Sequence, residues 1–558
     1  MPQPTTEAAR IDVFYEITAL LLLAAAVGAV AVRLRQPLIL AFIGVGVAVG
    51  PAGLGWIEAS EQVELLAALG ISLLLFVVGL KLDLHLIRSL GAVALATGLG
   101  QVVFTSVVGY FIALALGLER VPALYIAVAL TFSSTIIIVK LLSDKREIDS
   151  LHGRIAVGFL IVQDVVVVVA MIGLTAFGAA GAAQASAPQA LLLVALKGAA
   201  LLGALALLMR YVLPRLLHHL ARSTELLVLA GIAWAVTLAA AGDYLGFSKE
   251  IGAFLAGVSI ASTPYREAIS ARLVSLRDFL LLFFFVSLGA QLDLQLLGTQ
   301  LVPAMVLSVF VLVGNPLIVM AIMAAMGYRK RTGFLAGLTV AQISEFSFIL
   351  AALGATLGHI GRETLGLVTL VGLVTIGLST YMILYSHRLY EWLAPYLGIF
   401  ERQVPHREQK LDDGAPAADV IVFGLGRYGG NLARSLRRRG VTVLGVDFDP
   451  QAVRAWHGLG LPAQYGDAED PEFAAALPLA GASWVVSSVP QRDVNLALLH
   501  GLRAYGFRGR TALTAHSEAD AEQLRGKGAD WVLLPFADAA QQAAERIVAA
   551  LRGEPVTR

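Results

Sequence analysis

Long apolar segments restrict the fold of this chain more than any other feature of its sequence. About 20 helical residues are needed to span roughly 30 Å of hydrocarbon. Thirteen apolar runs of suitable length are separated by charges or by Gly/Pro clusters. They cover residues 13–32, 36–55, 62–80, 88–117, 121–142, 151–178, 189–217, 223–243, 246–263, 275–291, 295–326, 331–358 and 362–386. The sequence therefore predicts an α-helical membrane protein with about 13 transmembrane helices.

Charged residues are concentrated toward the C-terminus. Residues 1–400 carry 44 charged side chains, and the much shorter segment 401–558 carries 37. We expect a membrane domain at 1–394, a linker at 395–418 and a polar domain at 419–558. Both parts are close to neutral, so composition gives no reason to expect a nucleic acid partner. The chain has no cysteine, which excludes thiolate metal sites and disulfides within it.

The basic residues also predict an orientation in the bilayer. Eighteen Lys and Arg residues flank one face of the predicted spans, and four, namely Arg10, Arg120, Lys249 and Arg362, flank the other. Loops rich in Lys and Arg stay in the cytoplasm. We therefore expect the N-terminus outside and the C-terminal domain in the cytoplasm.

One carboxylate lies midway along an otherwise apolar span. Asp164 follows Gln163 in the run 151–178. A charge at this depth is expensive, so an intramembrane carboxylate is a functional candidate. The alternative is a protonated Asp164 that serves only as a hydrogen-bond anchor between helices.

Two other spans contain polar clusters. Thr131 to Thr135 places four hydroxyls in five positions of the fifth span, and Gln342 to Ser347, with Glu345 among them, interrupts the twelfth. Such clusters suit locally unwound helices, although Ser and Thr can also serve close helix packing and Glu345 can be a structural partner. Spans five and twelve run in opposite directions. An inverted repeat would make two broken helices cross near the midplane, as in many secondary transporters.

The Asn315-Pro316 pair in the eleventh span predicts a kink whose freed backbone group is satisfied by the Asn amide.

With these residues in view, the first 390 positions resemble the second monovalent cation:proton antiporter family, especially its Kef-type potassium/proton members. The resemblance rests on three segments: Ser133-Ser134-Thr135, His152-Gly153-Arg154 leading to Gln163-Asp164, and Ala341-Gln342 through Glu345-Phe346. It implies a bacterial inner-membrane antiporter that exchanges K⁺ or Na⁺ for H⁺ and works as a homodimer.

The resemblance also implies roles for particular residues. Asp164 and Gln163 would form the ion site beside the hydroxyls of Ser133, Ser134 and Thr135, and Gln342 and Glu345 would assist. Sodium-preferring electrogenic relatives carry two adjacent carboxylates, so Gln163 places this chain with the electroneutral group. Many relatives have a lysine near Asn315, and this chain lacks that cation.

The polar domain opens with a nucleotide-binding pattern. A short β run ends at Gly424, the glycines Gly426 and Gly429 lead into a helix, and a second β run ends in Asp447. Glycines in this order let the backbone approach phosphate, and the acid can accept hydrogen bonds from ribose. Alternating β and α segments to the C-terminus predict a Rossmann-like domain. A nucleotide-free packing module is the alternative.

This domain resembles the regulator of potassium conductance (RCK, TrkA-N) domains from Val420 to about Ile547. The likeness implies that Arg427 and its neighbour Tyr428 lie at the phosphates and that Asp467 and Ala468 contact adenine. It also implies dimers with AMP, NAD(H) or ATP bound.

Two other functions remain open on the sequence. An RCK-gated channel would need a carbonyl-lined filter such as TVGYG, which is absent from the sequence. A membrane oxidoreductase would need a substrate domain, but a single nucleotide-binding fold accounts for nearly all residues of the polar C-terminal segment. A nucleotide-regulated antiporter, a transporter and not an enzyme, accounts for more of these features.

Overall fold

The computed structural model describes residues 6–51, 53–55, 61–81, 92–145, 147–148, 150–182, 203–221, 223–245, 247–292, 297–400, 418–447, 450–466, 468, 473–474 and 477–552. The chain forms two compact units. Met1–Lys145, Ile155–Ile322 and Phe334–Leu393 make up the first, here called the membrane unit. Arg146–Arg154, Met323–Gly333 and Ala394–Arg558 make up the second. The domain boundaries expected at 394 and 418 remain predictions.

One group of helices in the membrane unit packs through glycines. Its members are α1 (Thr6–Arg33), α2 (Leu38–Val49), α3 (Glu61–Lys81), η1 (Leu208–Val212), α10 (Leu213–Leu220), α11 (Thr224–Tyr244), α12 (Lys249–Ala261) and α13 (Arg266–Ala290). A Cβ on Gly257 of α12 would collide with the Phe76 carbonyl of α3, and one on Gly289 of α13 would collide with the Ile43 carbonyl of α2. Small residues at these crossings let the backbones approach closely.

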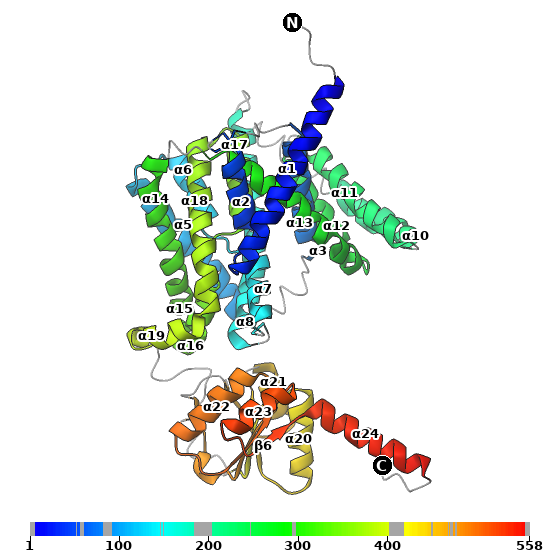
Figure 1. Cartoon of the computed structure of the whole chain (residues 1–558), viewed down its shortest axis with the longest axis vertical. Helices are drawn as coiled ribbons and strands as arrows, with labels where there is room; N and C mark the ends of the chain where they lie inside the picture. The colour runs from blue at the N-terminus through cyan, green and yellow to red at the C-terminus, as the bar shows by residue number, and fades with distance from the viewer. Residues whose placement is uncertain are drawn as a thin grey trace. The chain divides into compact units, whose positions relative to one another are not determined.

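A second group surrounds the polar clusters. It contains α5 (Ala92–Ala115), α6 (Arg120–Ala129), α7 (Thr135–Asp144), α8 (Leu151–Ala182), α14 (Leu297–Val309), η2 (Phe310–Gly314), α15 (Asn315–Ala325), α16 (Lys330–Leu338), α17 (Glu345–Thr356) and α18 (Arg362–Leu384). Figure 1 shows α14 and α18 side by side in this group. The short helix α19 (Ser386–Leu393) follows α18.

Within the described residues, eight helices are long and apolar enough to cross a membrane, and α2, α6 and α17 are shorter apolar helices. The predicted class, a multi-pass helical membrane protein, is confirmed. The first half of the predicted span 189–217, residues 189–202, lies outside the described residues. The count of thirteen therefore stays a prediction.

Both predicted interruptions are present. The fifth span is divided into α6, which ends at Ala129, and α7, which begins at Thr135. The twelfth is divided in the same way between Leu338 of α16 and Glu345 of α17. The new helix starts are capped by hydroxyls, since Ser134 accepts from Ile137 N and Ser344 accepts from Phe346 N. Side-chain oxygens thus replace the backbone acceptors that each break removes.

The predicted use of the Asn315 amide to satisfy the backbone freed at a kink is wrong, while the kink itself stays a prediction. A π-helical turn, η2, immediately precedes Asn315 and Pro316 in the eleventh span. The Asn315 side chain, however, contacts residues of three other segments. The irregular turn accommodates a proline, which has no N–H to donate, and leaves the amide available for long-range contacts.

The second unit contains a parallel sheet of six described strands in the order β3-β2-β1-β4-β5-β6. The strands are β1 (Val420–Phe423), β2 (Val443–Asp447), β3 (Ala463–Tyr465), β4 (Trp484–Ser487), β5 (Arg510–Thr514) and β6 (Trp531–Leu533). The helical segments are η3 (Tyr396–Phe400), α20 (Arg427–Arg438), α21 (Pro450–Gly458), η5 (Leu479–Gly481), α22 (Arg492–Ala504), α23 (Glu518–Gly526) and α24 (Pro535–Leu551). Val420 of β1 pairs with Val443 on one side and Trp484 on the other. The strand order reverses at β1 and β4, where doubly wound α/β folds bind ligands at the carboxyl ends of the strands.

Candidate functional site

The first break lies against the middle of α8. The Thr135 hydroxyl, at the start of α7, donates to Asp164 Oδ2 over 3.1 Å. The backbone N–H of Ser133 donates to Gln163 Oε1 over 3.0 Å. Adjacent residues of α8 thus contact adjacent parts of the unwound segment. Asp164 is half-buried and faces the N-terminal end of a half-helix, where a negative charge is stabilised by the helix dipole.

The three hydroxyls predicted at the ion site have different environments. The Thr135 hydroxyl contacts the carboxylate directly, and the Ser134 hydroxyl caps α7. The Ser133 hydroxyl is buried and makes no hydrogen bond within the described part of the chain. Because buried hydroxyls normally have partners, Ser133 offers an available oxygen in the same unwound segment as Thr135.

The second break holds Gln342 and Glu345. Both are fully buried. Gln342 Oε1 accepts from the Ser379 hydroxyl of α18 over 2.7 Å, and Gln342 Nε2 makes no hydrogen bond within the described residues. Glu345 is the first residue of α17, and its carboxylate lies 3.3 Å from the Ser344 hydroxyl. This carboxylate therefore also lies at a half-helix N-terminus.

Asn315 joins the two breaks at their C-terminal half-helix ends. Its Nδ2 atom lies 3.4 Å from the Leu130 carbonyl, just past the end of α6, and 3.3 Å from the Val340 carbonyl, just past α16. A second link is the Ser347 hydroxyl of α17, which donates to the Ala129 carbonyl of α6 over 2.6 Å. Three carbonyls at the breaks, those of Ala129, Leu130 and Val340, thus accept hydrogen bonds from across the crossing.

Two buried polar residues of α5, Gln101 and Thr105, complete the site and were not singled out from the sequence. They belong to a polar stripe that also includes buried Thr97, whose hydroxyl makes no hydrogen bond within the described residues and is not part of the network. Gln101 Oε1 accepts from Gln163 Nε2 over 2.7 Å, and the Thr105 hydroxyl donates to Asn315 Oδ1 over 2.7 Å. Their spacing of four residues places them on one helix face, which is the signal that could have identified them.

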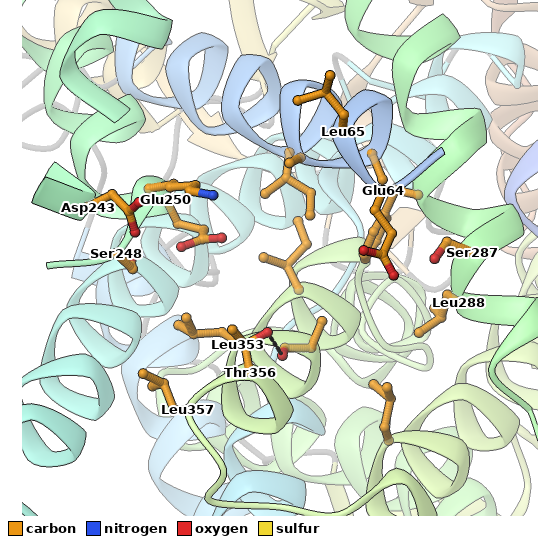
Figure 2. A pocket seen from close by; sticks show the side chains of 18 of the residues that line it. Glu64, Leu65, Asp243, Ser248, Glu250, Ser287, Leu288, Leu353, Thr356 and Leu357 are labelled. Carbon is orange, nitrogen blue, oxygen red and sulfur yellow. Dashed lines mark hydrogen bonds between the residues drawn. The ribbon is translucent and has the colours of Figure 1, made fainter. Parts of the chain in front are cut away.

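A cavity of about 880 Å³ lies between the two helix groups of the membrane unit. Figure 2 shows Glu64 on one side of it and Asp243 and Glu250 on another, with Leu353 and Thr356 of α17 between them. The lining reaches Ile349 of α17, one turn beyond Glu345, and includes neither Gln163 nor Asp164. Its lining includes Lys249, one of the four basic residues on the predicted outer face.

The glycine-rich turn of the second unit has the geometry of a phosphate-binding loop. Gly424 has φ +82°, a conformation that favours glycine, and a Cβ on Gly429 would collide with the Gly424 carbonyl oxygen. The Leu425 N–H donates to Asp447 Oδ2 over 2.6 Å. Ser488, which follows β4, donates its hydroxyl hydrogen to the Gly424 carbonyl over 2.9 Å. The loop is thus held from both flanking strands, and the start of α20 has no side-chain cap.

The other predicted nucleotide residues are placed only in part. Arg427 and Tyr428 are exposed in the first turn of α20. Partial burial and the charge of Asp538 raise the pKa of Tyr428. Ala468 is buried, and Asp467 lies outside the described residues.

Residues 19–384 match the family described as "Sodium/hydrogen exchanger, transmembrane". The chain belongs to this family. Residues 420–535 match the TrkA-N domain. The combination is that of a Kef-type cation/proton antiporter with a C-terminal TrkA-N domain, so the protein is a transporter and not an enzyme.

Relatives of known description agree with this assignment. A candidate K⁺ efflux antiporter, KefB, of Alkalimonas amylolytica is 29% identical over 513 residues, which cover 90% of this chain and 76% of that protein. The glutathione-regulated potassium-efflux system protein KefC of Escherichia coli O6:H1 is 28% identical over 481 residues, covering 85% and 75%. The structure of the sodium proton antiporter MjNhaP1 from Methanocaldococcus jannaschii aligns with a TM-score of 0.50 at 19% identity, covering 70% of this chain and 98% of that one. The last comparison supports the membrane fold.

Proposed function

We propose that this antiporter exchanges K⁺, or Na⁺, for H⁺ one for one at Asp164. The observation that carries the proposal is the contact between the Asp164 carboxylate and the Thr135 hydroxyl at the first break. Gln163 orders the same unwound segment, and the buried Ser133 hydroxyl supplies a further oxygen. Oxygen atoms from a carboxylate, hydroxyls and unwound backbone are the ligands that hard monovalent cations prefer.

The proposed chemistry is competition for one carboxylate. When Asp164 is protonated it is neutral, and when it is ionised it pairs with one monovalent cation, so both loaded states carry the same charge. Alternating access would carry either state across the membrane. Ser134, Gln342 and Glu345 would hold the half-helix starts in place. The half-saturating cation concentration should therefore rise as the pH falls.

We further propose the topology and the assembly. The protein would lie in a bacterial inner membrane with its N-terminus outside and its TrkA-N domain in the cytoplasm, as the distribution of basic residues favours. The acidic cavity beside Glu64 and Asp243 would then face the outside. A homodimer through the membrane and TrkA-N domains would follow the family resemblance.

The nucleotide proposal rests on the turn after β1. An adenine nucleotide, namely AMP, NAD(H) or ATP, would place its phosphates at the uncapped start of α20 near Gly426 and Arg427. Asp447 would accept from the ribose, and Asp467 and Ala468 would contact the adenine. Binding would change the transport rate through a coupling between the two sites.

The ion site is tested by dye-quench exchange in proteoliposomes, with K⁺ and Na⁺ scanned in turn. Asp164→Asn should abolish exchange. The matched control is Asp144→Asn, because Asp144 is exposed at the far end of α7 and should leave exchange unchanged. Transport by Asp164→Asn, or a valinomycin-free membrane potential generated by wild-type exchange, would show that the mechanism is wrong.

The nucleotide site is tested by calorimetry on the full-length protein. Gly426→Asp should remove binding of AMP, NADH or ATP because it adds a negative charge where phosphate would lie. Gly458→Asp adds the same charge at an exposed position with open space around it and should retain binding. Equal affinity in both variants would contradict the site. A transport rate that stays constant across a saturating titration would contradict the regulatory role.

A further inference from the structure

A continuous chain of side-chain hydrogen bonds runs through the crossing. It starts at the Ser133 N–H, which donates to Gln163 Oε1, and passes from Gln163 Nε2 to Gln101 Oε1. Gln101 Nε2 then donates to the Thr131 carbonyl over 3.2 Å and to the Thr105 hydroxyl over 3.1 Å. The side chains that form these hydrogen bonds are buried. A group that loses its hydrogen-bond partner here therefore cannot bond to water instead at low cost.

Two backbone groups of the same break determine the direction of this chain. The Ser133 N–H can only donate, so the oxygen of the Gln163 amide must face it. The Thr131 carbonyl can only accept, so the nitrogen of the Gln101 amide must face that carbonyl. The two amides then meet with Gln163 as donor and Gln101 as acceptor. No other orientation of the two amides satisfies all four groups.

We propose that Gln101 is a positioning residue for the cation site and acts through Gln163. Gln101 orients the Gln163 amide so that it accepts from the Ser133 N–H, and it ties the Thr131 carbonyl to α5. In this way it keeps the unwound segment in the conformation that presents Ser133 and Thr135 to Asp164. Gln101 would not contact the ion itself, since its hydrogen bonds are with Gln163, the Thr131 carbonyl and Thr105. This role rests on the proposed exchange at Asp164.

The expected effect of removing Gln101 is on affinity more than on turnover. Gln101→Leu leaves Gln163 Nε2 and the Thr131 carbonyl without their partners, and Gln163 becomes free to rotate away from Ser133. Loss of a residue that orients ion ligands typically weakens ion binding about tenfold or more. Gln101→Glu keeps an acceptor for Gln163 but turns an oxygen toward the Thr131 carbonyl, so it should also weaken binding.

The experiment measures the half-saturating K⁺ concentration and the maximal exchange rate of full-length variants in proteoliposomes. Gln101→Leu and Gln101→Glu should raise the half-saturating concentration about tenfold while the maximal rate changes less. Thr97→Val is the matched control, because Thr97 lies one turn away on the same buried stripe and its hydroxyl makes no hydrogen bond within the described residues. It should behave as wild type.

A double variant separates positioning from general damage. If Gln101 acts through Gln163, then Gln101→Leu combined with Gln163→Leu should bind K⁺ as Gln163→Leu alone does. Additive losses, or single variants that match Thr97→Val, would overturn the positioning role. Should Gln101→Leu fail to fold, the same comparison is made with Gln101→Glu, with K⁺-dependent thermal stabilisation as a second readout. Transport by Asp164→Asn would instead refute the proposed function itself.

Discussion

Replacing Asn315 by leucine should destabilise the membrane unit, because this amide satisfies both breaks. The change keeps a similar volume but removes the acceptor for Thr105 and the donor for the Leu130 and Val340 carbonyls. Hydrogen bonds between membrane helices average about 0.6 kcal/mol, so three of them amount to about 2 kcal/mol. The shift is about 2–4 °C per kcal/mol for 150–250 residues and falls as the unfolding entropy grows with size, so for the larger membrane unit we expect Tm to fall by roughly 3 °C.

The assay is thermal unfolding of the detergent-purified protein followed by size exclusion. Ser308→Ala is the control, since Ser308 lies on the preceding helix α14, is buried, and makes no hydrogen bond within the described residues. Asn315→Asp should be worse than Asn315→Leu at neutral pH, because a carboxylate oxygen would face two carbonyl oxygens. The reasoning is refuted if Asn315→Leu has the same Tm as Ser308→Ala. It is also refuted if Asn315→Asp lowers Tm less than Asn315→Leu does.

Further predictions concern packing and the second unit. Gly354→Ala should lower Tm by several degrees, because a Cβ there would collide with the Tyr125 ring, an overpacking that costs about 1–3 kcal/mol. Gly366→Ala, where the nearest atom lies at 3.5 Å, should not lower it. In the second unit, the backbone N–H and hydroxyl of Thr511 hold the pKa of Asp530 below its ordinary value. This stabilisation is present above the ordinary carboxyl pKa and is lost as the pH falls through the lowered folded value. The unfolding temperature of the second unit in Asp530→Asn should therefore be lower than in the wild type at pH 7. This difference between the two proteins should disappear in acid.

Local sequence patterns were sufficient to predict the breaks and the carboxylate beside them. Hydroxyls compete with the helix for backbone hydrogen bonds, so the cluster Thr131 to Thr135 indicated the break in the fifth span. The glycine turn before α20 was predicted for a similar reason, because Gly424 adopts a positive φ that other residues avoid. In both cases the cause lies within a few residues of the effect.

The contacts between the breaks could not be predicted in this way. Asn315 lies 185 positions from Leu130 and 210 from Thr105, and Gln101 lies 62 from Gln163. A proline next to Asn315 favoured a local role for its amide, and the structure shows a long-range one. Thr97, Gln101 and Thr105 share a helix face, but only the fold reveals what that face contacts.

The neutral amide at position 315 bears directly on the charge balance of transport. The carbonyl ends of α6 and α16 meet at Asn315, and the amide supplies hydrogen-bond donors there without a positive charge. Among the buried side chains that the structure describes, the only Lys or Arg is Arg277 of α13, which pairs with Asp278 outside the crossing. The proposed exchange at Asp164 therefore has no cationic side chain in the described crossing to release or recapture. Replacement of one proton by one monovalent cation would then leave the net charge of the crossing the same in both loaded states.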